Sequence, residues 1–356
     1  MDALGLEDLI SDLYSSEEKT RAFAAEDIAY DGYVEGIGPL LERLQVEPSR
    51  FVREVIISSL KKMQGPELIA QVIPYLNSDD AFIRNGCIDI LSRQGEDAIE
   101  ALRNSLRSPD KDIRKFSLDT LFLIGTESAA EIIAASLNDP DVNNLITAVE
   151  YLGRLELRAQ VGPINKLFLD TQNTLLRCTC LETMAVIGNE ESLQAVNQMY
   201  PDYQSISFLE KYSFLKFVAR KGNMIHLALI ISLLEEKNSL MHKEIINAIE
   251  GILRRSKFEE LPDELLTALN EYLDSPIREI NKYEILLLIS DYKNREILDI
   301  LKKYLNPQNR LLCLGAVEGI GQIGDAEARL ALIKLKEGLD DEELLESIER
   351  SLNKLM

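Results

Sequence analysis

The sequence predicts an all-α protein built as an α-solenoid, a row of roughly eleven antiparallel helix pairs. A motif that ends in glycine recurs at Gly65, Gly95 and Gly125, and its interval of 30 residues is the length of one helix–turn–helix unit. Apolar residues within each motif follow helical spacing, and no segment shows the period-two alternation of a strand. Because each unit of such a row packs on its neighbours, 356 residues need no single large core.

The second helix of each unit is marked at both ends. A turn rich in Asp, Asn, Ser or Pro precedes it, where a side-chain oxygen caps free N–H groups and Pro fits the first turn. These turns lie at Asn77-Ser78-Asp79-Asp80, Ser108-Pro109-Asp110, Asn138-Asp139-Pro140-Asp141 and Asn306-Pro307. A glycine is expected to end the second helix in the left-handed conformation, at Gly65, Gly95, Gly125, Gly188, Gly222 and Gly324.

First helices with one apolar face are expected over residues 66–76, 97–106 and 128–137. We divide the single solenoid, residues 1–356, into an N-terminal cap unit (1–33), regular repeats (34–200), divergent repeats (201–292) and C-terminal repeats with a cap (293–356). The acidic cap unit is expected to be polar on its free side, or else to dock a basic partner. The divergent repeats are longer and richer in aromatic residues, so they represent either ordinary drift or a bend or binding segment.

Composition excludes some classes of partner. The formal net charge is −21 and the sequence pI is near 4.6, whereas nucleic-acid binding draws its affinity from Lys and Arg. We therefore expect neither nucleic acid nor an anionic membrane surface as a partner. No apolar run is long enough to span a bilayer, and the N-terminus lacks the pattern of a signal peptide. Since four cysteines do not suggest a disulfide framework either, we expect a cytoplasmic protein.

An arginine recurs near the start of the second helix. Asp or Asn, any residue, an aliphatic residue and Arg, followed by small and apolar residues and Ile-Gly, resembles the HEAT-like repeat of phycobilisome lyases and many bacterial repeat proteins. The resemblance covers most of the chain and implies first helices on a convex side and second helices on a concave side. It also implies that each recurrent Arg bonds the turn acid of a neighbouring unit; clamping a ligand is the alternative role. This arginine column is Arg53, Arg84, Arg114 and Arg177, and it is interrupted at Leu145 and Cys313.

An acidic residue recurs five positions after the arginine position. This acidic column consists of Asp89, Asp119, Glu150, Glu182, Glu250 and Glu318, with interruptions at Ser58 and Lys216. Acids at one repeat position would form a ridge along the concave face and would steer a basic or amphipathic partner towards it. Alternatively, the acids are solvated residues that favour helix.

The residue types for metal or cofactor chemistry are sparse. The only histidines are His226 and His242, and neither is followed by Glu, so the iron-binding His-Glu pairs of the HEAT-like deoxyhypusine hydroxylases are missing. Cys178 and Cys180 could form a soft-metal pair, but Cys180 shares a small, buried repeat position with Cys87, which indicates a core cysteine. We expect no metal and no cofactor.

We therefore predict a non-catalytic scaffold, adaptor or regulator that binds a partner protein on its acidic concave face. The alternative is an enzyme, a bilin lyase or related chromophore-handling protein of the phycobilisome-lyase type, as the resemblance implies. Such a lyase would hold the pyrrole nitrogens with acids of the column and stack the chromophore on Phe116 and Phe122, although Phe116 is expected to pack in the core.

Overall fold

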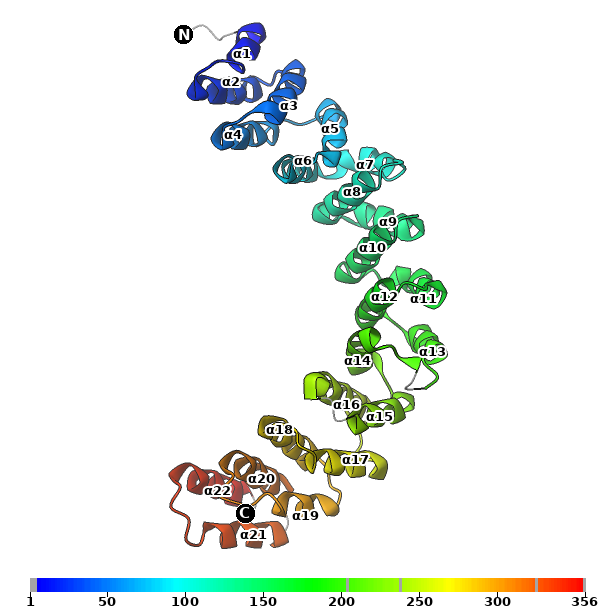
Figure 1. The fold of residues 1–356 in the computed structure, drawn as a ribbon, viewed down its shortest axis with the longest axis vertical. Helices are drawn as coiled ribbons and strands as arrows, with labels where there is room; N and C mark the ends of the chain where they lie inside the picture. Colours follow the sequence, from blue (N-terminus) through cyan, green and yellow to red (C-terminus); the bar gives the residue numbers. More distant parts are fainter. Residues whose placement is uncertain (1–4, 203–204, 237–238, 324–325, 355–356) are drawn as a thin grey trace. The chain divides into compact units, whose positions relative to one another are not determined.

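The computed structural model describes residues 5–202, 205–236, 239–323 and 326–354, and these residues form helices and no strand. The helices follow one another as eleven antiparallel pairs, so the predicted all-α solenoid is confirmed for this part of the chain (Figure 1). We call the two members of a pair the first helix and the second helix. None of the helices in the described ranges is long and apolar enough to cross a bilayer.

The first helices are α1 (Leu6–Asp12), α3 (Ile37–Val46), α5 (Pro66–Val72), α7 (Ile99–Ser105), α9 (Glu127–Ala135), α11 (Val161–Asp170), α13 (Glu190–Met199), α15 (Leu227–Glu235), α17 (Asp263–Leu273), α19 (Glu296–Lys302) and α21 (Ala326–Lys336). The second helices are α2 (Glu18–Tyr30), α4 (Arg50–Leu60), α6 (Ala81–Arg93), α8 (Lys111–Ile124), α10 (Val142–Arg154), α12 (Thr174–Ile187), α14 (Phe208–Lys221), α16 (His242–Ser256), α18 (Glu279–Ser290), α20 (Arg310–Ile323) and α22 (Glu342–Lys354).

Three of the four predicted turns contain the residue that caps a second helix; before α20 it is Asn309, not Asn306-Pro307, that accepts a hydrogen bond from the first-turn N–H of Leu312. Ser49, Asp80, Asp110 and Asp141 are the N-cap residues of α4, α6, α8 and α10, and the side chain of each accepts a hydrogen bond from a backbone N–H of the first turn. The N–H of Phe82, for example, lies 2.8 Å from the Asp80 carboxylate. Such a cap satisfies donors that have no partner within the helix, which explains why the helices begin at these residues.

The glycines predicted to end second helices differ in conformation. Gly95 and Gly125 follow α6 and α8 with φ of 57° and 67°, as predicted. Gly65 has a positive φ of 115° but is the N-cap of α5, whereas α4 already ends at Leu60, so the prediction of a helix-ending cap is wrong there. Gly188 and Gly222 do not adopt a positive φ, so the prediction is wrong there; Gly222 has φ −57°. A side chain is excluded at both for a different reason, because a Cβ atom would lie 2.3 Å from the Met184 carbonyl oxygen at Gly188 and 2.7 Å from that of Val218 at Gly222. The remaining predicted stop, Gly324, lies outside the described residues.

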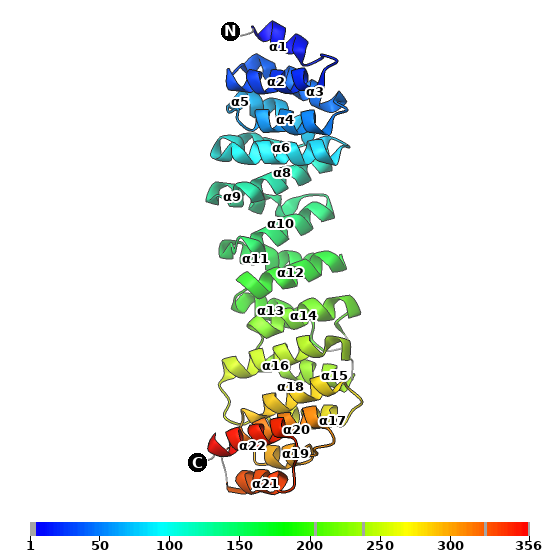
Figure 2. The same ribbon diagram turned by 90° about the vertical axis from the view of Figure 1, so that its left-hand side faces the viewer.

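The chain divides into two compact units. Unit 1 comprises the residues up to 167 together with 171–183, and unit 2 comprises 168–170 together with the residues from 184 onwards. In unit 1 the second helices α2, α4, α6, α8 and α10 pack on one another in succession as one layer, and the first helices form the other layer (Figures 1 and 2). In unit 2 the second helices α14, α16, α18, α20 and α22 do the same. We call the outer surface of the second-helix layer of either unit its second-helix face; the division into four sequence regions stays a prediction.

The core is mainly aliphatic, with Cys87 and Cys180 fully buried in it. Burial raises the pKa of both thiols to about 12, so they are neutral, small apolar side chains at neutral pH. In unit 2 an aromatic series runs through the core: the ring centroid of Tyr200 lies 6.0 Å from that of Phe168 and 5.7 Å from that of Phe214. Within 201–292, Phe214, Phe217 and Tyr272 are buried and serve packing, whereas Phe208, Tyr212 and Phe258 are exposed.

Candidate functional site

Arginines of the column form hydrogen bonds with the turn that precedes their own second helix. Three members of the column share one contact, a hydrogen bond from the guanidinium to the backbone carbonyl oxygen six residues earlier. The bonds join Arg84 to Ser78 (2.6 Å), Arg114 to Ser108 (2.9 Å) and Arg177 to Thr171 (2.7 Å). These carbonyls lie just past the C-terminal end of a first helix, where a cation also complements the helix dipole. The shared contact of the column is therefore with the arginine's own turn.

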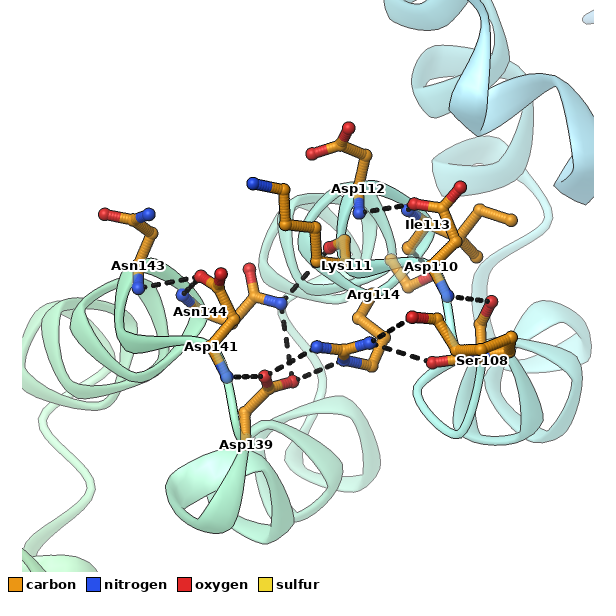
Figure 3. A network of polar contacts seen from close by, with 12 residues as sticks. Ser108, Asp110, Lys111, Asp112, Ile113, Arg114, Asp139, Asp141, Asn143 and Asn144 are labelled. Atoms are coloured by element: carbon orange, nitrogen blue, oxygen red, sulfur yellow. Dashed lines mark hydrogen bonds and ion pairs between the residues drawn. The ribbon is translucent and has the colours of Figure 1, made fainter.

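Two of the arginines also reach the next unit. Arg114 forms a two-pronged ion pair with Asp139, at 2.8 and 2.9 Å (Figure 3). Burial would raise the pKa of Asp139, but the Arg114 guanidinium holds it below its usual range. Arg53 pairs with Asp80 of the next turn. Arg84 instead lies over the ring of Phe116, 5.1 Å from its centroid.

A polar link remains where the arginine is replaced. At Leu145 the preceding residue, Asn144, is buried and donates from Nδ2 to the Lys111 carbonyl oxygen at 3.2 Å and to Asp139 at 3.4 Å (Figure 3). The amide thus joins α10 to both the α8 turn and the acid that Arg114 binds. The interruption at Leu145 does not remove the polar contact between these two units.

Sequence reasoning missed one member of this set, Arg21. Arg21 is buried, and its guanidinium donates a hydrogen bond to the carbonyl oxygen of Ser15, again six residues earlier. The same guanidinium donates two hydrogen bonds to the carboxylate of Glu47, at 2.8 and 2.9 Å. Arg43 and the backbone N–H of Ser49 donate to the same carboxylate. Burial would raise the pKa of Glu47, but these donors lower it to about 2. The six-residue spacing from Ser15 to Arg21, which matches that from Ser108 to Arg114, is the signal that could have found it.

In unit 1 three acids of the acidic column have bases of their own. Asp89 pairs with Lys61 of the preceding second helix and with Arg93. Burial would raise the pKa of Asp89, but these cations hold it below its usual range. Asp119 accepts hydrogen bonds from Lys115 and, at 2.6 Å, from the Tyr151 hydroxyl.

Glu150 pairs with Arg154 at 3.5 Å, and Glu182 is exposed on α12. A basic residue follows the column position four residues later in five of the units, and residues at that spacing are neighbours on a helix. These bases are Lys62, Arg93, Arg154, Arg220 and Arg254, and for Lys62 and Arg220 the column residue is Ser58 or Lys216 rather than an acid. In unit 1 the (i, i+4) spacing pairs Asp89 with Arg93, Asp119 with Lys115 and Glu150 with Arg154. These acids of the predicted ridge therefore have partners that a search for (i, i+4) pairs would have indicated.

Aromatic rings on the same face are covered. Phe122 stacks on Tyr151 with ring centroids 4.1 Å apart, and the Arg154 guanidinium lies 4.5 Å from the Phe122 centroid. Phe116 is half-buried beneath Arg84 and Lys115 rather than packed in the core, contrary to expectation. These contacts use the ring surfaces that a bound chromophore would need.

In unit 2 two acids of the column share a cleft. Glu250 and Glu318 line a cavity of about 690 Å³ between α16, α18 and α20, together with Glu284 and Asp291. The remaining lining is Lys243, Ile246, Asn247, Arg254, Leu287, Leu288, Tyr292 and Gln322. We call this cavity the acidic cleft. It combines four carboxylates, two bases and an apolar wall.

Two contacts position the carboxylates of the acidic cleft. Glu318 accepts a hydrogen bond from the Tyr283 hydroxyl at 3.0 Å, and burial, reinforced by this carboxylate, raises the pKa of Tyr283. Glu284 lies 3.2 Å from Nε2 of the buried His242. Within the described residues no group of three or more His, Cys, Asp or Glu side chains is placed to hold a metal ion.

Comparison with known proteins defines the class of fold. No protein-family model matches the sequence, and no curated protein matches it. Solved structures do match, and those with a TM-score above 0.5 include importins, which are HEAT-repeat solenoids. The chain is thus an α-solenoid of HEAT-like repeats.

The individual matches are distant in sequence. Kap95p, solved with RanGDP, is 10% identical with a TM-score of 0.56 over 98% of this chain and 56% of that chain. Importin beta is 12% identical, with a TM-score of 0.54 over 98% and 57%. Kap121p bound to Nup53p is 15% identical, with a TM-score of 0.53 over 100% and 46%. The chain spans about half the length of these proteins, and the likeness concerns the fold alone.

Proposed function

We propose that the chain is a non-catalytic scaffold or adaptor that binds a partner protein through its second-helix face, with the acidic cleft as the main contact. The observation that carries the proposal is the cleft itself, in which Glu250 and Glu318 of the acidic column meet Glu284 and Asp291. The solved structures of similar fold include Kap95p with RanGDP and Kap121p bound to Nup53p, which are complexes between proteins. The expected cytoplasmic location stays part of this proposal.

The kind of partner is inferred from which carboxylates of the second-helix face already form an ion pair with Lys or Arg. Asp89, Asp119 and Glu150 each form an ion pair, so a basic partner would have to displace a base to reach them. The acidic cleft instead holds four carboxylates against Lys243 and Arg254. Partner Lys or Arg side chains would be attracted there, and apolar neighbours would pack on Leu287 and Leu288. The proposed partner therefore presents a basic, amphipathic segment.

The same face bears on the alternative function, a bilin lyase. Such a lyase needs open aromatic surfaces, but Phe122 is covered by Tyr151 and Arg154, and Phe116 by Arg84.

A defined peptide tests the cleft. A fluorescein-labelled peptide of alternating Lys and Leu is titrated with the full chain at 0.15 M salt, where charges further apart than about 8 Å are largely screened. We expect saturable binding by fluorescence anisotropy, weakened at least about tenfold by the double substitution Glu250→Lys and Glu318→Lys. Circular dichroism checks that the double variant keeps its helix content.

The matched control is the double substitution Glu264→Lys and Glu271→Lys. Both residues are exposed on α17, a first helix of the same unit, so the change in net charge is identical and the location differs. Equal loss of affinity in the two double variants would reject the acidic cleft as the site. Affinity purification from the native cell with the wild-type and cleft-variant chains then identifies proteins that require the cleft.

A further inference from the structure

A second cleft lies in unit 1, in the layer formed by the first helices. It has a volume of about 720 Å³ and is built from α7, α9 and the turns that follow them. Arg103, Leu106 and Arg107 come from α7 and its end, and Ile132 and Ala135 come from α9. We call it the arginine cleft. It adjoins the turns that Arg114 closes (Figure 3).

The charges that line the arginine cleft are unlike those of the rest of the chain. Arg114 and Asp139 also line it, but they neutralise each other in a two-pronged ion pair. Two arginines, Arg103 and Arg107, then face a single acid, Glu131. A locally positive cavity in a chain of net charge −21 is a feature that the overall composition does not predict.

The two arginines are available to a ligand. Arg103 is half-exposed and pairs with Glu100 at 3.2 Å, an exposed contact of the kind that contributes little to stability. Arg107 is exposed, and its guanidinium makes no hydrogen bond or ion pair with any residue in the described ranges. This contrasts with Arg53, Arg84 and Arg114, all of which are committed to turns or neighbouring units.

We propose that the arginine cleft binds an acidic, amphipathic peptide segment of a partner protein. Arginine presents a planar fork of N–H donors that matches a carboxylate, so Arg103 and Arg107 would hold Asp or Glu side chains. Leu106, Ile132 and Ala135 supply an apolar wall for the neighbouring residues of the segment. The occupant is assigned by charge complementarity: the lining carries three arginines against two acids, and the Arg107 guanidinium has no ion pair within the described ranges.

This site is independent of the proposed function. It lies in the other unit, is built from first helices rather than second helices, and selects the opposite charge. If an experiment refutes one of the two proposed sites, the other site is therefore unaffected.

The test uses a fluorescein-labelled peptide of alternating Glu and Leu, titrated with the full chain at 0.15 M salt. We expect saturable binding that the double substitution Arg103→Glu and Arg107→Glu weakens at least about tenfold. The matched control is Arg93→Glu with Arg154→Glu, which makes the same charge change in the same unit on the second-helix face. The Lys and Leu peptide should bind the Arg103 and Arg107 double variant as it binds the wild type.

Three results would overturn the proposal. The Glu and Leu peptide could fail to bind the wild-type chain. The two double variants could lose affinity equally, which would indicate a diffuse electrostatic effect. A concentration-dependent mass in analytical ultracentrifugation that only the Arg103 and Arg107 variant abolishes would assign a second copy of the chain as the occupant.

Discussion

The Glu47 carboxylate gives the sharpest stability prediction. It is 4% exposed, lies just past the end of α3, and accepts hydrogen bonds from Arg21, Arg43 and the Ser49 N–H. These donors lower its pKa from an ordinary value of 4.5 to about 2. At about 1.4 kcal/mol per pKa unit, the ionised form stabilises the folded chain by about 3 kcal/mol at neutral pH. Glu47→Gln removes that charge at nearly constant volume, so we expect a loss of about 3 kcal/mol.

The pH dependence has a definite sign. The pKa of Glu47 is lower in the folded than in the unfolded chain, so its stabilisation is fully present above pH 4.5 and is lost as the pH falls towards 2. At pH 3.5, Glu47 is partly protonated, and its stabilisation of the folded chain falls from about 3 to about 2 kcal/mol. The difference between wild type and Glu47→Gln should shrink accordingly.

Urea unfolding at pH 7 and pH 3.5, followed by circular dichroism, measures the free energies. Because helix pairs of a solenoid can unfold separately, hydrogen exchange should locate the loss in α2, α3 and α4. The control is Glu150→Gln, since Glu150 is half-exposed and 3.5 Å from Arg154, and its effect should stay within about 0.5 kcal/mol. Equal effects of the two substitutions, or a Glu47→Gln effect that does not shrink at pH 3.5, would refute the reasoning.

Three further predictions concern a buried histidine and two glycines. His226 is fully buried, and burial lowers its pKa, so the free energy of unfolding should fall as the pH drops below about 6.5; urea titrations from pH 7 to pH 5 should show a shallower fall for His226→Gln. A Cβ at Gly251 would lie 2.1 Å from the Ala219 carbonyl oxygen, so Gly251→Ala should lower the melting temperature through a loss of about 1–3 kcal/mol. Gly162 in α11 has no such neighbour within 4 Å, so Gly162→Ala should change the stability by less than about 0.5 kcal/mol.

The repeat architecture could be predicted because its signals are local. A capping Asp or Ser at the start of a second helix, such as Asp110, acts within one turn of chain, and the glycine that ends the helix, such as Gly125, acts through its own φ. Gly188 and Gly222 carry the same sequence signal, but there the absence of a side chain relieves crowding with a carbonyl oxygen one turn earlier. Sequence alone does not distinguish these two uses of glycine.

The charge pattern of the candidate face was harder to predict. The position of each acid follows from helical spacing, but its electrostatic environment depends on other helices, as with Lys61, just past the end of α4, beside Asp89 of α6. The Tyr151 hydroxyl on Asp119 likewise comes from the next second helix. Both clefts are also assembled from residues far apart in the sequence, so neither had a local signal.

A count of acids is therefore a poor guide to where a solenoid of this kind attracts a partner. Coulomb attraction acts on the charge that remains after local pairing, and at physiological salt it decays over about 8 Å, less than the reach of one helix pair. Glu150 with Arg154 is nearly neutral at that range, whereas the acidic cleft keeps an excess of carboxylate and the arginine cleft an excess of guanidinium. Opposite excess charges on different layers of the two units would let one chain hold a basic segment and an acidic segment at once, which is the property that an adaptor requires.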